Sequence, residues 1–390
     1  METPWSKRHK REFKGCEYSL SNSFAEPLSM PELVRLVEEA GDATDLLSEY
    51  QGHDLRYVPN GGSADLRSDI ASVVYGGILS AEDILVFPGG QLAVQTAAQA
   101  FASGGCHSIV FSPGYQSTID SPNWVAGNGG VTTLPRRAED GWQVRPDDIR
   151  KAIRPNTGYL ILNEPYNPGG VVMDAELQRE VIEICREHGI VVLCDEVYRL
   201  LEHRDADRLP SMAEAYEKGV SAVTMSKPWG GCGITIGWLA CRDASLIERL
   251  TDAQYFGCVA CSRASEVQAR MVLRVSDQIL ADRRQILLQN KALLTTFIEE
   301  KYPEWFEWVR PNAGAIAFVK FRGPMSTAEL GAELASGGIS IKPAYCFAGD
   351  KVSEDTDYFR IGFGERRMPA ALEALGRFVD KNGDAWRRRR

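Results

Sequence analysis

Long apolar runs and paired metal-binding motifs are missing from this 390-residue sequence. No run approaches the roughly 18 apolar residues that cross a bilayer, and the polar N-terminus has no signal-peptide core. Cys258 and Cys261 form a single Cys-x-x-Cys without a second pair. We therefore expect no metal site, no membrane partner, and reduced thiols in a cytoplasmic protein.

Net positive charge is also lacking: the sequence has 44 Lys and Arg residues and 53 Asp and Glu residues, which gives a formal charge of −9. A field of this sign does not attract nucleic acid or an anionic membrane, so we expect no nucleic-acid partner. The basic runs at residues 7–14 and 387–390 are interpreted as solvated tails. An apolar fraction of 44% is ordinary for a globular protein with a large core.

Short apolar runs alternate with helix-length stretches through the middle of the chain. Buried strands that alternate with helices predict an α/β fold with a mostly parallel sheet, covered on both faces. The expected strands are residues 84–87, 108–111, 159–162, 190–194, 220–225 and 236–241, and the expected helices include 63–75, 92–101 and 175–188.

The last third of the chain has a different pattern. Residues 246–298 are predicted to be helical, and the strands and helices that follow indicate a smaller α+β domain. We therefore predict three parts: an N-terminal arm that belongs to the small domain (1–45), a large ligand-binding domain (46–275) and a small C-terminal domain (276–390).

The stretch from residue 223 to 239 places Lys227 between two apolar runs, followed by four glycines. Desolvation at the end of a buried strand lowers the pKa of a lysine and frees its amine to attack a carbonyl, which suggests a Schiff base. The glycines allow the backbone to approach a ligand closely. The alternative is a lysine at a strand end with its ammonium group in water.

Polar residues follow several predicted strands, at the edge where ligands of parallel sheets bind. Gly90, Gln91 and Leu92 open a helix, whose N-terminal N–H groups suit a phosphate. Tyr115 follows the next strand and could stack on a planar ligand, or it could be a half-buried loop tyrosine.

Three further residues continue this set at later strand ends. Asn167 lies in an Asn-Pro turn and can donate a hydrogen bond. Asp195 ends an apolar strand, where a carboxylate is costly unless it faces a cation, and Tyr198 follows it. Pyridoxal phosphate fits all of these groups: Asp195 would keep its ring nitrogen protonated, Asn167 and Tyr198 would hold its phenolate oxygen, and Tyr115 would cover one face.

The segments Gly-Gly-Gln, Pro-Gly-Tyr, Asn-Pro-Gly-Gly, Asp-Glu-Val-Tyr and Thr-Met-Ser-Lys resemble those of the fold type I aminotransferases of class I/II. The resemblance covers nearly the whole chain. It implies that Lys227 is the catalytic lysine that binds the cofactor covalently, and that Gly90, Gln91, Thr224 and Ser226 hold the phosphate.

The same resemblance implies a substrate site and a partner. Arg360 resembles the small-domain arginine that binds the α-carboxylate of a small amino-acid substrate; the alternative is a strand arginine paired with an internal acid. Tyr57 matches the tyrosine that reaches the phosphate of the neighbouring subunit. We therefore expect a homodimer with composite active sites.

The sequence departs from the common pattern in three places. Thr235 stands where the family has a phosphate-binding arginine. The Ser-Lys-Pro-Trp-Gly-Gly-Cys-Gly segment and the loop from Ser19 to Pro27 are also unusual, and they resemble the capreomycidine synthase group. That resemblance implies a guanidinium substrate. Ser23 and Glu26 in the variant loop are then substrate-binding candidates, with Glu164 as another acid; either acid could instead be structural.

The narrower resemblance implies a cyclase that removes water from 3-hydroxy-L-arginine and closes a ring through the guanidine, in antibiotic biosynthesis. An amino-acid aminotransferase is the alternative, because both reactions use the same core residues. A non-catalytic pyridoxal-phosphate sensor is disfavoured, since such proteins normally carry a DNA-binding appendage and no basic domain or helix-turn-helix is found here.

Overall fold

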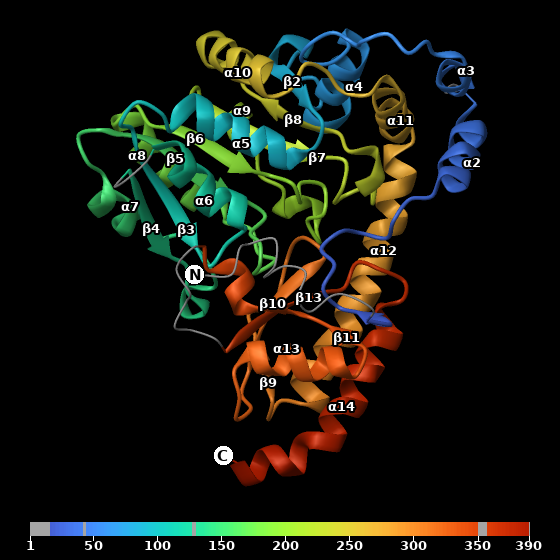
Figure 1. Ribbon diagram of the computed structural model, residues 1–390, viewed down its shortest axis with the longest axis vertical. Helices are drawn as coiled ribbons and strands as arrows, with labels where there is room; N and C mark the ends of the chain where they lie inside the picture. Colours follow the sequence, from blue (N-terminus) through green and yellow to red (C-terminus); the bar gives the residue numbers. More distant parts are fainter. Residues whose placement is uncertain (1–15, 42–43, 127–129, 350–356, 390) are drawn as a thin grey trace.

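A seven-stranded sheet forms the centre of the larger part of the molecule (Figure 1). The computed structural model describes residues 16–41, 44–126, 130–349 and 357–389. The strand order is β2-β8-β7-β6-β5-β3-β4, and β3 to β7 run parallel to one another. The strands are β2 (Ile84–Phe87), β3 (His107–Ser112), β4 (Val131–Pro135), β5 (Thr157–Asn163), β6 (Val191–Asp195), β7 (Gly219–Thr224) and β8 (Gly237–Ala240).

Strand β8 runs antiparallel to both of its neighbours. The connection from β7 to β8 contains a 3₁₀ turn, Cys232–Ile234, but no α-helix that could carry the chain back across the sheet. The sheet is therefore mostly parallel, as predicted, with one reversed strand beside the Lys227 loop.

Helices cover both faces of this sheet because its strands alternate apolar side chains between two cores. On β3, Val110 faces one core, and Ile109 and Phe111 face the other. The first face carries α5 (Gly90–Phe101), α6 (Gln116–Ala126) and α10 (Ala244–Gly257). The second carries α4 (Ala64–Tyr75), α7 (Pro146–Ala152), α8 (Ala175–Glu187), α9 (Met212–Ala215) and α11 (Arg263–Arg274).

A smaller antiparallel sheet, in the order β12-β13-β10-β9, lies below the large sheet in Figure 1. Its strands are β9 (Phe306–Trp308), β10 (Ile316–Phe321), β12 (Lys342–Pro343) and β13 (Tyr358–Gly362), with α13 (Thr327–Ser336) and α14 (Met368–Arg389) beside them. The N-terminal strand β1 (Tyr18–Ser19) pairs with β11 (Ile339–Ser340). Strand β1 of the arm therefore lies in this smaller part, whereas Leu33 and Val37 farther along the arm pack in the core of the large part.

Helix α12 (Ser276–Thr295) connects the two parts. Its residue Ile279 packs in the core of the large part, and Leu287 and Leu294 pack in the core of the small part. A π-helical turn, Thr296–Lys301, continues it, and α2 (Met30–Ala40) and α3 (Thr44–Gly52) lie beside α11. Within the described residues, no helix is long and apolar enough to span a bilayer.

Two features differ from the sequence-based expectations. The edge strand β4 was not predicted, because its residues are half-exposed or exposed and lack a buried apolar run. The basic run at 387–390 was predicted to be a solvated tail; residues 387–389 are exposed to solvent, as predicted, but they end α14, and Arg387 pairs with Glu304 at 2.8 Å. The other basic run, at residues 7–14, lies outside the described residues.

Candidate functional site

The polar residues predicted at the strand ends share one edge of the large sheet. Tyr115, Asn167 and Lys227 follow β3, β5 and β7, and Asp195 is the last residue of β6. Because these strands are parallel, their carboxyl ends open at the same edge. The small sheet meets this edge, as the contact between Asn167 and Arg360 of β13 shows.

Lys227 is held close to the N-terminal arm. Its Nζ donates a hydrogen bond to Ser23 Oγ at 3.0 Å and lies 5.9 Å from the centre of the Phe24 ring. Its carbonyl accepts a hydrogen bond from the Ala25 N–H. Burial, reinforced by the positive charge of Arg360, lowers the pKa of Lys227 to about 8. A substantial fraction of the amine is therefore neutral near physiological pH and able to act as a nucleophile or base.

Asp195 is a buried acid, with 2% of its surface exposed. Its Oδ1 accepts a hydrogen bond from the Val197 N–H at 3.3 Å. Burial raises the pKa of Asp195 to about 7, and the charge of Lys227 offsets only part of this effect. A carboxylate in this position favours a cationic partner beside it.

Arg360 reaches from the small sheet to the large one. Its Nη1 donates to Asn167 Oδ1 at 3.0 Å, and its Nη2 donates to the Ser21 carbonyl at 2.8 Å. Its buried Nε has no hydrogen-bond partner among the described residues. The guanidinium therefore retains a donor for an anion, and the Asn167 amide nitrogen is left to donate elsewhere.

Two tyrosines complete this part of the site. Tyr198 is buried, and desolvation raises its pKa to about 12, while Ser23 contributes a hydrogen bond to its phenol. The Tyr115 hydroxyl donates to Gln91 Oε1 at 3.2 Å, and desolvation raises the Tyr115 pKa. Both phenols therefore stay protonated and can donate hydrogen bonds.

The start of α5 forms a narrow cradle with β7 and β8. A Cβ at Gly237 would lie 2.5 Å from the Gly90 nitrogen, and one at Gly90 would lie 3.3 Å from Thr224 Cβ. The hydroxyls of Thr224 and Ser226 are 3.1 Å apart. Close backbone approach, free helix N–H groups and two hydroxyls at one place suit an anionic group.

Thr235 lies at the rim of this cradle. Its φ of 57° and ψ of 40° are left-handed, an unfavourable conformation for a β-branched residue. A Cβ at Gly89 would come within 3.7 Å of Thr235 Cγ2. Backbone strain of this kind clusters at functional sites.

The remaining predicted residues lie in different surroundings. The Leu92 side chain packs against the core of the large sheet, so only its backbone N–H is available to an anion at the start of α5. Tyr57 is 86% exposed. Glu26 Oε2 accepts a hydrogen bond from the Arg366 N–H at 2.6 Å, in a depression that Asp282 and Arg283 also line.

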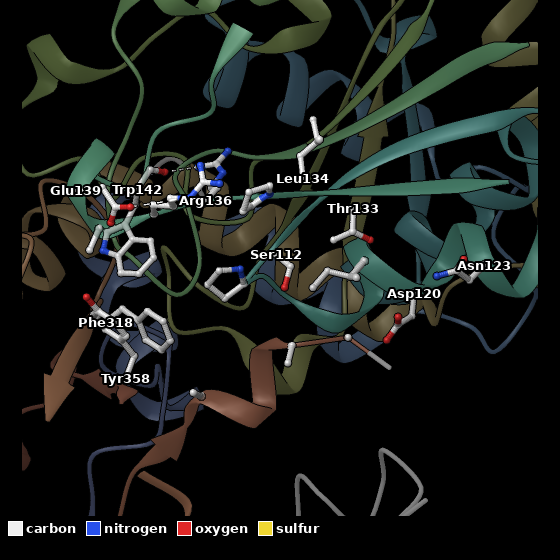
Figure 2. Close-up of a pocket in the computed structure, with 18 residues that line it drawn as sticks. Ser112, Asp120, Asn123, Thr133, Leu134, Arg136, Glu139, Trp142, Phe318 and Tyr358 are labelled. Atoms are coloured by element: carbon white, nitrogen blue, oxygen red, sulfur yellow. Dashed lines mark hydrogen bonds and ion pairs between the residues drawn. The ribbon is translucent and has the colours of Figure 1, made fainter. Parts of the chain in front are cut away.

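Glu164 is engaged in the interior and is not available to a substrate guanidinium, so of its two stated alternatives the structural one holds. It pairs with Arg136 at 2.6 Å and also accepts a hydrogen bond from the Met173 N–H. Arg136 also lines a cavity of about 600 Å³, together with Trp142 and Tyr358. Figure 2 shows these three side chains at the wall of the cavity. None of the predicted site residues lines this cavity.

The structure adds two residues that sequence reasoning missed. Asn163 donates to the Asp195 carbonyl at 2.7 Å and accepts from the Asn167 N–H at 2.6 Å, so it fixes both loops. Its position at the end of β5 was a usable signal. Lys342 lies on β12 opposite Arg360; no local pattern marks it.

Comparison with known proteins identifies a family. The family described as "Aminotransferase class I and II" matches residues 29–375. A "Probable aspartate/prephenate aminotransferase" of Thermus aquaticus is 26% identical over 329 residues, 82% of each chain. A PLP-dependent aminotransferase structure from Streptococcus suis has a TM-score of 0.86 and 27% identity, and covers 98% of this chain and 99% of its own.

A solved PLP-dependent cyclase, OrfR, is also similar in structure. Its TM-score is 0.84, with 24% identity and 98% of each chain covered. At 24% identity, this structural similarity supports a shared fold only.

Proposed function

Because the chain belongs to the aminotransferase class I and II family, we propose that it transfers the amino group of an α-amino acid to a keto acid. The cofactor is pyridoxal 5′-phosphate, in common with its structural relatives. The observation that carries the proposal is the convergence of Lys227, Asp195 and the Arg360–Asn167 pair at one sheet edge.

The residues present fit this cofactor. The raised pKa of buried Asp195 indicates a site that favours a cation, which a pyridinium nitrogen supplies. The cradle has no space for a Cβ at Gly237 and little space for one at Gly90, and it presents helix N–H groups. Phosphate there would be held by neutral groups, since Thr235 replaces the family's arginine.

Each residue has a role in binding the cofactor. The Asp195 carboxylate would accept a hydrogen bond from the protonated ring nitrogen, and Asn167 and Tyr198 would donate hydrogen bonds to the phenolate oxygen. Tyr115 would cover one face of the ring. The phosphate is held by the backbone N–H groups and hydroxyls of the cradle, from Gly90, Gln91, Leu92, Thr224 and Ser226.

Bound pyridoxal phosphate withdraws electrons from the substrate's α-carbon and so acidifies its proton. Lys227 Nζ takes that proton, which its lowered pKa permits near neutral pH. Ser23 Oγ, at 3.0 Å, orients the amine. Arg360 binds the α-carboxylate with its unpartnered donor and fixes the α-carbon beside Lys227.

The site is completed by a second copy of the chain. Leu55 and Tyr57 are 95% and 86% exposed, and Phe256 is 90% exposed. Large apolar side chains that are this exposed support an interface between copies. In the resulting homodimer, Tyr57 reaches the phosphate of the partner subunit.

A cyclase is the second candidate function. The segment from Ser226 to Gly233 and the variant loop with Ser23 and Glu26 support the capreomycidine synthase reading, in which 3-hydroxy-L-arginine is the substrate and antibiotic biosynthesis the context. The engagement of Glu164 by Arg136 counts against it, because it removes one candidate partner of the guanidinium.

A product assay separates the two functions. Purified holoenzyme is mixed with 3-hydroxy-L-arginine without a keto acid, and separately with amino-acid donors and keto acids. Release of a keto acid, with conversion of the cofactor to its amine form, supports the aminotransferase. A product that has lost one water, with the cofactor spectrum restored, contradicts it and supports the cyclase.

All nine cysteines are free, which supports a reducing compartment such as the cytoplasm.

A further inference from the structure

Three buried N–H donors lie in the turn that follows β4. Arg136 Nε, Arg137 Nη1 and Trp142 Nε1 are buried, and none of them has a hydrogen-bond partner among the described residues. The turn brings them together, because the Trp142 N–H donates to the Arg137 carbonyl at 2.8 Å and Arg136 Nη1 donates to the Trp142 carbonyl at 3.1 Å. Buried donors in native proteins are almost always paired, so three of them in one turn indicate acceptors that come from a bound molecule.

All three residues line the cavity of about 600 Å³ that Figure 2 shows. Sites for small molecules typically have volumes of about 300 to 1,000 Å³, so this cavity is large enough for one. Its walls come from both parts of the molecule: α6 and β4 belong to the large part, and Phe318 of β10 and Tyr358 of β13 belong to the small part. Because the residues assigned to the Lys227 site do not line it, a ligand in this cavity would occupy a separate site.

The two arginines differ in how closely an acid approaches them. Arg136 pairs with the buried Glu164 at 2.6 Å. Arg137 lies 3.9 Å from both Glu139 and Asp140, which is beyond hydrogen-bond distance. A ligand carboxylate at about 2.8 Å can therefore bind the Arg137 guanidinium more strongly than either of these acids does.

The wall beside these donors is aromatic. The rings of Phe318 and Tyr358 stack with their centres 5.1 Å apart, and Tyr358 meets Trp142 edge to face, also at 5.1 Å. Figure 2 shows these three rings at the same end of the cavity as Arg136, whereas Asp120 lies at the other end. A flat ring can pack against this wall while its carboxylate binds the donors of the turn, away from Asp120.

The backbone of Trp142 gives a second, independent observation. Its φ of 62° is left-handed, which is unfavourable for a bulky aromatic residue, and backbone strain of this kind clusters at functional sites. We propose that the cavity is a second ligand site, which binds a small aromatic carboxylate. The carboxylate oxygens accept hydrogen bonds from the unpartnered donors of the turn, with Arg137 supplying the charge, and the ring packs against Phe318 and Tyr358.

Calorimetric titration of the full-length holoenzyme with cinnamate and with its neutral analogue cinnamyl alcohol tests the proposal. The wild type is expected to bind cinnamate at least about 10-fold more tightly than the alcohol. Arg137→Gln is expected to lower the cinnamate affinity to that of the alcohol and to leave the cofactor absorbance unchanged, which shows that the variant is folded. Arg145→Gln is the matched control, because Arg145 also lies 3.9 Å from Asp140 but does not line the cavity.

A further variant, Arg360→Gln, distinguishes the cavity from the Lys227 site. Cinnamate binding is expected to persist in it, and its loss there would place the carboxylate at Arg360 and overturn the inference. Absence of saturable cinnamate binding in the wild type also overturns it, and water is then the partner of the three donors. The same holds if the preference for cinnamate survives in Arg137→Gln, or if Arg145→Gln loses as much of it. Cinnamate has no amino group to transfer, so these results are independent of the product assay.

Discussion

Replacing Asp195 by Asn isolates the cost of keeping a carboxylate buried without its cofactor. Asn preserves the shape and can still accept the Val197 N–H. Burial raises the pKa of Asp195 from 3.8 to about 7, which corresponds to about 4 kcal/mol against the folded apoprotein at high pH. Because the folded-state pKa is raised, this cost is absent below the unfolded pKa and grows as pH rises towards the folded pKa.

The stability gain of Asp195→Asn should therefore depend on pH. Over the linkage curve we expect a gain of about 2 kcal/mol near pH 5.5 and about 4 kcal/mol near pH 8 in the apoprotein. Denaturant unfolding of both proteins at several pH values measures it. Asp252→Asn on the surface of α10 is the control and should show no such trend.

A gain that stays constant between these pH values, or a loss, would refute the reasoning about Asp195. In the holoenzyme we expect the opposite sign: Asp195→Asn removes the partner of the ring nitrogen and weakens cofactor binding, which an absorbance titration detects. A variant that binds pyridoxal phosphate as tightly as the wild type would contradict the assigned role.

Two further substitutions test the packing around the site. Glu164→Gln leaves the Arg136 charge buried without its partner and should cost about 3 kcal/mol of unfolding free energy. Glu180→Gln, in the exposed pair with Arg150, is the control and should cost under about 1 kcal/mol. Similar losses in both variants would show that burial of the pair does not determine the loss. Gly237→Ala puts a Cβ 2.5 Å from the Gly90 nitrogen and should weaken cofactor binding at least about 10-fold in an absorbance titration, by distorting the cradle. Gly233→Ala, with nothing within 4 Å, should bind normally, and equal behaviour of the two variants would reject the cradle.

Most elements of the large sheet were predictable because their signals are local. Strand β2 has the predicted bounds, and β6 and β7 lie within one residue of them, since each is a short apolar run buried on both faces. Strand β4 was not predicted because its residues are half-exposed or exposed, as is usual for an edge strand, and so give no buried apolar run. Helix α6 was missed as well; it contains Pro122, a residue that normally marks the end of a helix.

The candidate site was predictable to the extent that it follows strand ends. Asp195 and Lys227 were found because a charged residue after a buried run is costly without a partner. Glu164 satisfied the same local criterion, and the structure pairs it with Arg136 instead. Local sequence cannot distinguish the two cases, because the partner of each acid comes from a distant segment.

The sequence by itself determined the alternation of strands and helices, the glycine-rich turns and the row of polar groups at one sheet edge. Those features depend on the periodicity and conformational preferences of neighbouring residues. The tertiary structure alone decided that Arg360 contacts Asn167 across 193 positions and that Lys342 lies opposite Arg360. It also fixed how far the pKa values of Asp195 and Lys227 move from their usual ranges, through burial and the charge of Arg360 beside Lys227. Strand register, burial and charge pairing arise from packing between segments far apart in the chain, and no local pattern encodes them.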